Sequence, residues 1–403
     1  MPDRIIGLDI ARGISIVGMV WAHLGMASIS ISSGFPSALF AVLAGVSVGI
    51  MSAPSQQPIP RLAIRGLLIM AIGAVLSAVQ SYIAVVLVTM GALIAALGPL
   101  ARRSTRQLVW LLALFTFLSA TYAAVSQTFA FYNDFFAGVY PFLAWLAYGT
   151  AGLLIYRLVV YAPWSWQLGT LLASLGPVCA LVWWRESKFV NATDIFGKSA
   201  VYSDEPVTMP DPLDGPQLSW NSFISPEAHS GGLGDVLASI MVALIIITSC
   251  LLLSRLRPIK ALLYPVHAMG SMALSSYIIH ALTAGAFVAL ATFGAQHEVI
   301  IGDEASLYSK IPFERYQDKT ANANSWEELW DKEGAYYDSL SEPASSHDLA
   351  PEALSTPLPF WLTVLVLLGG ASVWKLFFFR GPAEAALRSL EKKALTAPPL
   401  ETS

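Results

Sequence analysis

Near its start the chain has an apolar stretch that contains Asp9, Arg12 and His23, Arg4-Ile-Ile-Gly-Leu-Asp-Ile-Ala-Arg-Gly-Ile-Ser-Ile-Val-Gly-Met-Val-Trp-Ala-His23. Its length predicts a transmembrane helix, because about 20 apolar residues span a bilayer. Asp9 and Arg12 are three residues apart, so they share a helix face and can pair. Arg12 and His23 are eleven residues apart, about three turns and about 16 Å along one face. Ionisable groups inside a membrane are costly and often functional, whereas the structural alternative is a snorkelling Arg12 and a hydrogen-bonded His23.

The composition is that of a polytopic membrane protein. Of the 403 residues, 55% are hydrophobic and 12% are charged, whereas a soluble chain has about 25% charged residues. Cys179 and Cys250 provide neither a disulfide framework nor the spacing of metal ligands, so we expect no metal. A formal net charge of −4 does not suggest a protein that binds nucleic acid. The first apolar run lacks a small-residue cleavage site, so we interpret it as a retained helix.

Segments of about 20 apolar residues predict an all-α bundle of about ten transmembrane helices. The ninth segment is long, and we expect it to be kinked or to form two elements. The ten predicted spans are residues 7–27, 35–53, 63–80, 82–100, 107–126, 140–160, 165–184, 235–254, 264–293 and 358–379.

The charges predict the orientation of these helices. Lysine and arginine concentrate on alternate short connections, which stay in the cytoplasm, while two long acidic segments lie between the basic connections. We therefore expect both termini to be cytoplasmic and both acidic loops to face outward, in a plasma membrane. The expected organisation is 1–184 with seven helices, the outer loop 185–234, 235–294 with two helices, the acidic outer loop 295–357, and 358–403 with the last helix and a tail.

Several motifs resemble a transmembrane acyltransferase superfamily. An arginine, ten intervening residues and a histidine in the first helix resemble the signature of the acyltransferase type 3 family. The pattern Leu8-Asp9-x-x-Arg12-Gly13-x-x-x-x-Gly18-Met19 is more similar to the heparan-α-glucosaminide N-acetyltransferase-like branch. Further segments that resemble this branch are 40–50, Pro141-x-x-x-Trp145-x-x-x-Gly149, Gly270-x-Met-Ala-Leu-x-x-Tyr277 and 379–388.

This resemblance implies that cytoplasmic acetyl-CoA donates its acetyl group to a hydroxyl or amine of an envelope saccharide or glycolipid on the outer side. The donor carries phosphates, for which arginine is a suitable bidentate partner. We predict that Arg12, Arg65 and Arg157 bind acetyl-CoA, with Asp9 as the partner of Arg12. In the alternative interpretation, some of these arginines only fix the topology.

Acyl transfer needs a base for the acceptor proton, and histidine titrates in the required range. The candidates are His23, His229 and His280. His23 comes first because it belongs to the motif, but in the sugar N-acetyltransferase itself this position resembles asparagine and the catalytic histidine lies in the following loop. The corresponding loop here, 27–34, has no histidine, so the choice of base stays open. We also expect His23 and His280 to approach each other at the outer end of a cavity whose inner end is lined by Arg12.

Two other functions are compatible with the sequence. A transporter or lipid flippase would also need ionisable groups at depth, although no inverted repeat is evident. A non-enzymatic envelope assembly protein would use the acidic loops as its working surface. The identity of the acceptor, the length of the acyl chain and the oligomeric state are left open by the sequence.

Overall fold

The computed structural model describes residues 4–24, 33–53, 58–79, 84–129, 133–188, 218–295 and 357–396, and these residues form helices without any strand. The predicted all-α class is therefore confirmed. The helices are α1 (Ile6–Leu24), α2 (Phe35–Ser52), α3 (Pro58–Val79), α4 (Leu87–Leu100), α5 (Thr105–Thr128), α6 (Asp134–Ala137), α7 (Phe142–Ile155) with a π-helical continuation (Tyr156–Val160), α8 (Trp164–Lys188), α9 (Trp220–Ile224), α10 (Leu233–Leu253), α11 (Arg257–Leu262), α12 (Tyr264–Gly270), α13 (Ala273–Ala295), α17 (Leu358–Phe377) and α18 (Pro382–Thr396).

Every predicted span corresponds to helix in the structure. Within the described residues, eight helices are long and apolar enough to cross a membrane, and Leu87–Leu100 and Ala273–Phe287 are shorter apolar helices. The long ninth segment is interrupted at residues 271–272, which separate α12 from α13, so the expected division into two elements is confirmed. The expectations for 295–357 and for most of 185–234 fall outside the described residues.

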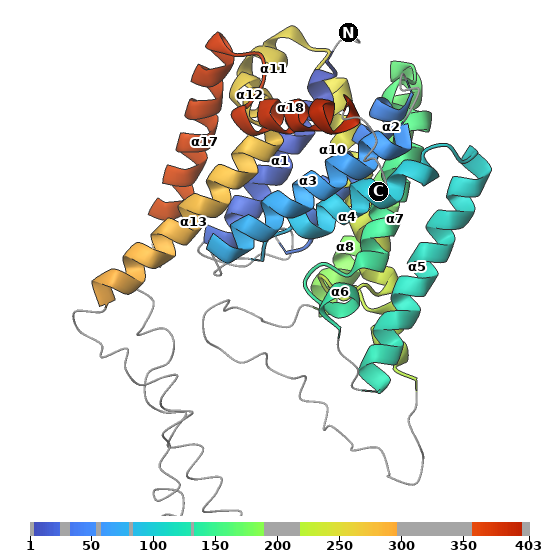
Figure 1. The fold of residues 1–403 in the computed structure, drawn as a ribbon. Coiled ribbons are helices and arrows are strands. Elements are labelled where there is room, and N and C mark those ends of the chain that lie inside the picture. The colour runs from blue at the N-terminus through green and yellow to red at the C-terminus, as the bar shows by residue number, and fades with distance from the viewer. Residues whose placement is uncertain are drawn as a thin grey trace, which may run out of the picture.

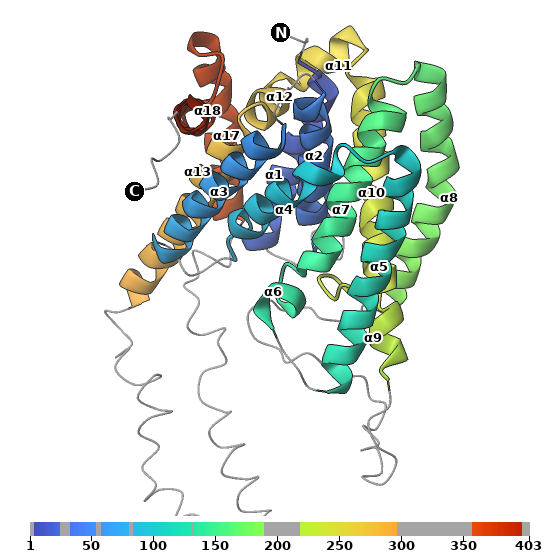
Figure 2. The ribbon, with the colours of Figure 1, turned by 45° about the vertical axis from the view of Figure 1, so that its right-hand side comes forward.

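The bundle has two distinct ends (Figure 1). The N-terminus, α11 and α18 lie at one end, which we call the N-terminal end. Helix α13 ends and α17 begins at the other end, which we call the opposite end (Figures 1 and 2). This arrangement agrees with an even number of passes and places both described termini on one side.

Helix α1 lies in the interior of the bundle, and glycines permit its closest contacts. A Cβ atom at Gly270 of α12 would lie 1.8 Å from the Asp9 carbonyl oxygen. A Cβ atom at Gly13 of α1 would lie 2.5 Å from the Val266 carbonyl oxygen. Small residues of this kind let membrane helices approach at backbone distance. The break after α12 is thereby held directly against the polar face of α1.

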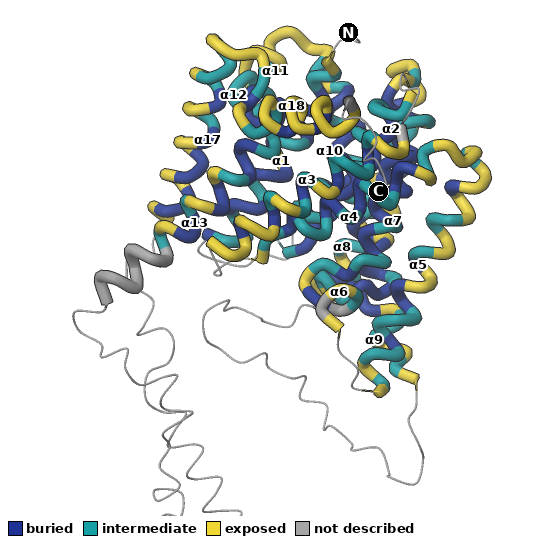
Figure 3. The backbone as a smooth tube through the Cα atoms, viewed as in Figure 1, coloured by how far each residue is buried: buried dark blue, intermediate teal, exposed yellow. Residues whose placement is uncertain are grey.

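Many residues of the outer helices are exposed (Figure 3), and large apolar residues are among them. Trp110 of α5, Trp183 of α8 and Leu376 of α17 are 68%, 72% and 71% exposed. Large exposed apolar surfaces are rare on soluble monomers, whereas lipid tails provide a favourable environment for these side chains. The chain is therefore a multi-pass membrane protein.

Candidate functional site

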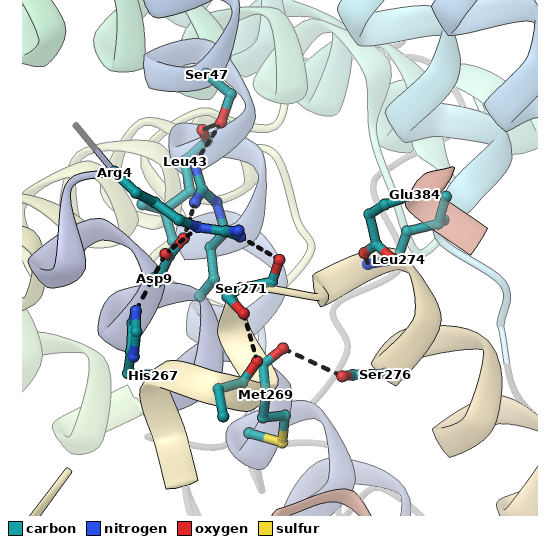
Figure 4. A network of polar contacts seen from close by, with 12 residues as sticks. Arg4, Asp9, Leu43, Ser47, His267, Met269, Ser271, Leu274, Ser276 and Glu384 are labelled. Atoms are coloured by element: carbon teal, nitrogen blue, oxygen red, sulfur yellow. Dashed lines mark hydrogen bonds and ion pairs between the residues drawn. The ribbon is translucent and has the colours of Figure 1, made fainter. Parts of the chain in front are cut away.

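Asp9 is the centre of a buried polar cluster near the N-terminal end of the bundle (Figure 4). Its carboxylate is 1% exposed and accepts hydrogen bonds from Arg4 Nε and Arg12 Nη1, both at 2.6 Å. His267 Nε2 of α12 lies 3.6 Å from Asp9 Oδ2. A buried carboxylate is stable only when it is paired in this way. The predicted pairing of Asp9 with Arg12 is confirmed.

Arg12 connects this cluster to α2. Its Nη2 donates to Ser47 Oγ at 2.8 Å, and Ser47 Oγ donates in turn to the Leu43 carbonyl at 2.6 Å. The Arg12 side chain is 20% exposed, so it is held between α1 and α2 while part of it faces open space. Such a guanidinium is positioned before a ligand arrives, which reduces the entropy lost on binding.

The cluster also contains two cations that sequence reasoning did not single out. Arg4 donates to the Ser271 carbonyl, at the break between α12 and α13. Lys375 of α17 donates to Ser271 Oγ at 2.9 Å, and its Nζ lies 3.3 Å from His267 Nε2. Arg4 precedes the first predicted span and Lys375 lies near the end of the last one, where positive residues are normally interpreted as topological signals. Only the three-dimensional packing shows that they converge.

A cavity of about 460 Å³ lies next to this cluster. Its wall is formed by Arg4, by residues of α1, α2, α3, α4, α12, α13 and α18, and by the break between α12 and α13. Three arginines contribute to its wall, and most of the remaining wall is apolar. The lining residues are Arg4, Arg12, Phe40, Leu43, Ala44, Ser47, Ile50, Met51, Arg65, Ile69, Leu87, Met90, Ile94, Gly270, Ser271, Ala273, Leu274 and Glu384. The cavity could thus hold an anionic group at its arginines and an apolar chain along its walls.

The structure brings Arg65 to this cavity but not Arg157. Arg65 Nη1 donates to Glu391 Oε2 at 3.1 Å, and Arg61 binds the same carboxylate. Arg157 instead donates to the Ala101 carbonyl at 2.8 Å, at the end of α4, and is absent from the cavity wall. Its contacts are those of a cation at a helix C-terminus. The structure therefore gives Arg157 a helix-capping position rather than the predicted place at the cavity.

The predicted approach of His23 to His280 is confirmed. Their rings stack with centroids 5.4 Å apart and an interplanar angle of 23°. His280 is fully buried, and neither of its ring nitrogens has a hydrogen-bond partner among the described residues. Buried polar groups are nearly always satisfied, so an orphaned pair of nitrogens is a candidate for a functional group.

His229 lies close to this pair, in the segment between α9 and α10. It interacts electrostatically with His23 and packs its ring 6.0 Å from that of Tyr140. Burial, followed by the positive charge of Arg185, lowers the pKa of His229 to about 4, although a hydrogen bond with the Val139 backbone opposes the shift. His229 is therefore neutral near pH 7. The three predicted histidines occupy one region of the protein.

A second buried ion pair positions the His229 segment and was not predicted from the sequence. Arg185 of α8 is 1% exposed and lies 3.5 Å from the carboxylate of Asp235, at the start of α10. Arg185 also donates to the Ser33 carbonyl and stacks over Phe35, with Cζ 4.2 Å from the ring centroid. Asp235 Oδ2 accepts from the Gly231 backbone at 3.2 Å. These contacts tie the start of α2 to the segment that presents His229.

The cavity does not include the histidines. Phe40 is part of its wall, and the Phe40 ring stacks on Tyr277 with centroids 6.4 Å apart. The Tyr277 ring in turn contacts that of His280 at 6.2 Å. The expectation of one cavity reaching from Arg12 to His23 is therefore wrong for this conformation, because an aromatic layer of Phe40 and Tyr277 stands between the two sites.

Comparison with known families gives a partial match. Residues 217–301 match a family described as "Protein of unknown function (DUF418)". This range includes His229, His267 and His280, and thus the parts of α10–α13 that face α1. No curated protein matches the chain.

Proposed function

We propose that this protein is a membrane-embedded acyltransferase. In this proposal it moves an acetyl or other short acyl group from cytoplasmic acyl-CoA to a saccharide or glycolipid acceptor outside the plasma membrane. The single observation that carries the proposal is the arrangement along α1, which presents Arg12 to a cation-lined cavity and His23 to a second histidine. The first-helix motif also supports the proposal, because it resembles the heparan-α-glucosaminide N-acetyltransferase-like branch.

The chemistry of the cavity wall supports the proposed donor. Arg4, Arg12 and Arg65 would face its phosphates, and the apolar wall formed by α2 and α4 would accompany the pantetheine arm. That arm extends roughly 15–20 Å by extended-chain geometry. Arg12 and His23 are about 16 Å apart along a helix, so a thioester could reach the histidines while the phosphates stay at the arginines. The Phe40–Tyr277 layer would have to open for this approach.

At the histidines, the acceptor oxygen or nitrogen would attack the thioester carbonyl carbon. A neutral imidazole would take the acceptor proton as the new bond forms. The carbon–sulfur bond then breaks, and the CoA thiolate leaves and receives a proton. His23 is the proposed base, and His280 and His229 are its neighbours. A general base has to be neutral before it takes up a proton.

The test is thioester turnover by the purified protein in proteoliposomes with acetyl-CoA supplied on the side of the N-terminus. Release of the free CoA thiol should depend on an added saccharide or glycolipid acceptor, and the acceptor should gain one acetyl mass. His23→Ala should reduce turnover by about 10²–10⁴-fold, the range that general-base catalysis contributes. Full acetyl transfer by this variant would refute the role of His23 as the base. Absence of thioester turnover in the wild type would refute the proposed acyltransferase activity.

One observation favours a second candidate, a transporter. Phe40 in the cavity wall contacts Tyr277, and Tyr277 contacts His280, so these two rings lie between the cavity and the histidines as a gate would. A transporter would move a labelled anionic lipid or saccharide across the proteoliposome membrane without consuming acetyl-CoA. Acceptor-dependent thiol release therefore separates the two functions.

A further inference from the structure

Helix α18 lies across the N-terminal end of the bundle, next to α3 and α13 (Figures 1 and 2). It carries two carboxylates that point into the protein, Glu384 and Glu391. They are seven residues apart, which is two turns, so they share one helix face. Each of them occupies a position that would otherwise bind an anion.

Glu391 neutralises a pair of arginines on α3. Its carboxylate is 3% exposed and accepts from Arg61 Nε and from Arg65 Nη1. Arg65 belongs to the cavity wall. Two arginines that share one carboxylate form a ready site for a phosphate, which also takes charge-assisted bonds from guanidinium groups.

Glu384 occupies the N-terminus of α13 (Figure 4). Its Oε1 accepts from the backbone N–H groups of Leu274 at 2.8 Å and Ser275 at 3.3 Å, and the Ser275 hydroxyl donates to Oε2. The first N–H groups of a helix have no partner within the helix and attract anions, including phosphate. Glu384 itself lines the cavity, so this anion-binding position opens into the same space as Arg12.

Apart from the two carboxylates, the described contacts of α18 include the buried side chain of Leu387 and the Ala383 backbone N–H, which donates to Ser275 Oγ at 3.0 Å. Leu387 is 1% exposed and is its main buried apolar side chain, while Arg388 and Leu390 are exposed. A short connection, 378–381, joins α18 to α17. The two carboxylates contribute to the attachment of α18 to the bundle, and an anion that competes for their partners weakens this attachment.

We propose that α18 is a lid over the donor cavity, in which Glu384 and Glu391 occupy the positions that phosphate groups of acyl-CoA take when the lid is displaced. This inference rests on the proposed function for the nature of the ligand. It assigns two phosphate subsites, one at Arg61 and Arg65 and one at the start of α13. In the closed state the carboxylates compete with the donor, and the apparent affinity is reduced by the fraction of molecules with the lid open.

The first experiment measures the affinity of CoA for the full chain in nanodiscs. Glu384→Gln and Glu391→Gln each weaken a contact of the lid, and CoA should bind about threefold to tenfold tighter to both variants. Glu186→Gln is the matched control, because it removes the same charge from an exposed position of α8 away from the cavity wall, and its affinity should equal that of the wild type. Unchanged or weaker CoA binding in both lid variants overturns the lid.

The second experiment follows the lid itself. Leu387→Cys in a Cys179→Ser background places one buried thiol under α18, and its rate of reaction with a maleimide should rise severalfold when desulfo-CoA is added. Ala385→Cys, on the exposed face of the same helix, should react at one rate with and without this ligand. If Leu387→Cys does not fold, the carboxylate variants still decide the question. A wild type that turns over acetyl-CoA without any change in the Leu387→Cys rate overturns the lid alone, whereas a wild type that binds no CoA overturns the proposed function.

Discussion

His23 of α1 and His280 of α13 stack their imidazole rings with centroids 5.4 Å apart. The two residues are far apart in the sequence, and each would be costly if it faced lipid. His280 is fully buried, and its two ring nitrogens lack partners among the described residues. Burying these two nitrogens lowers the stability of the fold, and proteins accept such a loss mainly at functional sites.

The first prediction follows from this cost. His280→Leu should raise the thermal midpoint of the protein in detergent, because an unsatisfied buried polar group costs about 1–3 kcal/mol. The same variant should lower acetyl transfer by at least about 10²-fold if the histidine pair acts as a unit. Differential scanning fluorimetry and thiol release measure the two effects.

Thr363→Val is the matched control for His280→Leu. The Thr363 hydroxyl is also buried without a partner among the described residues, but it lies on α17 and outside the histidine group. This variant should keep full activity and should not lower the midpoint. If His280→Leu retained wild-type turnover, His280 would be a packing residue only.

The second prediction concerns Arg12. Arg12→Ala should weaken CoA binding by about tenfold to a hundredfold, since a hydrogen bond to a charged group contributes about 1.5–3 kcal/mol. Arg12→Lys keeps the charge, but it cannot bind Asp9 and Ser47 with two arms as the guanidinium does, so it should restore the affinity only in part. Isothermal titration with CoA measures all three proteins.

Arg157→Ala serves as the control for Arg12, because Arg157 binds the end of α4 and is absent from the cavity wall. Its CoA affinity should be that of the wild type. Equal CoA affinity in the wild type, Arg12→Ala and Arg12→Lys would leave Arg12 as a structural partner of Asp9 alone.

Hydrophobic patterning predicted the helices, and helix periodicity predicted the Asp9–Arg12 pair. The approach of His23 to His280 followed from their depths, which a regular helical rise determines. The contact of Arg4 with Ser271 and the pair of Arg185 with Asp235 could not be predicted in this way. They join helices that are distant in the sequence, and which helices become neighbours depends on packing that no local pattern records. The Phe40–Tyr277 layer was missed for the same reason.

The third prediction concerns pH and His229. Its folded pKa is about 4 and its unfolded pKa is about 6.5, so between these values the unfolded chain binds more protons. The contribution to stability is present above about pH 6.5 and is lost as the pH falls toward 4. The positive charge of Arg185 faces His229 and disfavours a protonated ring.

His229→Asn should therefore lose less stability than the wild type when the pH is lowered from 7 to 4.5. Asparagine tolerates the positive φ of 61° at this position better than most residues do. Thermal midpoints across this range measure the difference. Parallel curves of thermal midpoint against pH for the two proteins would show that His229 has the same pKa in the folded and the unfolded chain.

The last prediction concerns orientation, on which the direction of acyl transfer depends. The basic connections predict a cytoplasmic N-terminal end. The start of α5 lies toward this end, and α9 lies toward the opposite end (Figures 1 and 2). Cysteines should be placed at exposed positions without capping roles, since Ser104 and Ser219 both cap helices with their side chains. Arg103→Cys and Asn221→Cys in a Cys179→Ser background meet this condition.

In intact cells an impermeant maleimide should label Asn221→Cys and leave Arg103→Cys unlabelled until the cells are opened. Labelling of Arg103→Cys alone would invert the topology, and the arginine-lined cavity would then face away from cytoplasmic acyl-CoA, which would remove the physical basis of the proposed reaction.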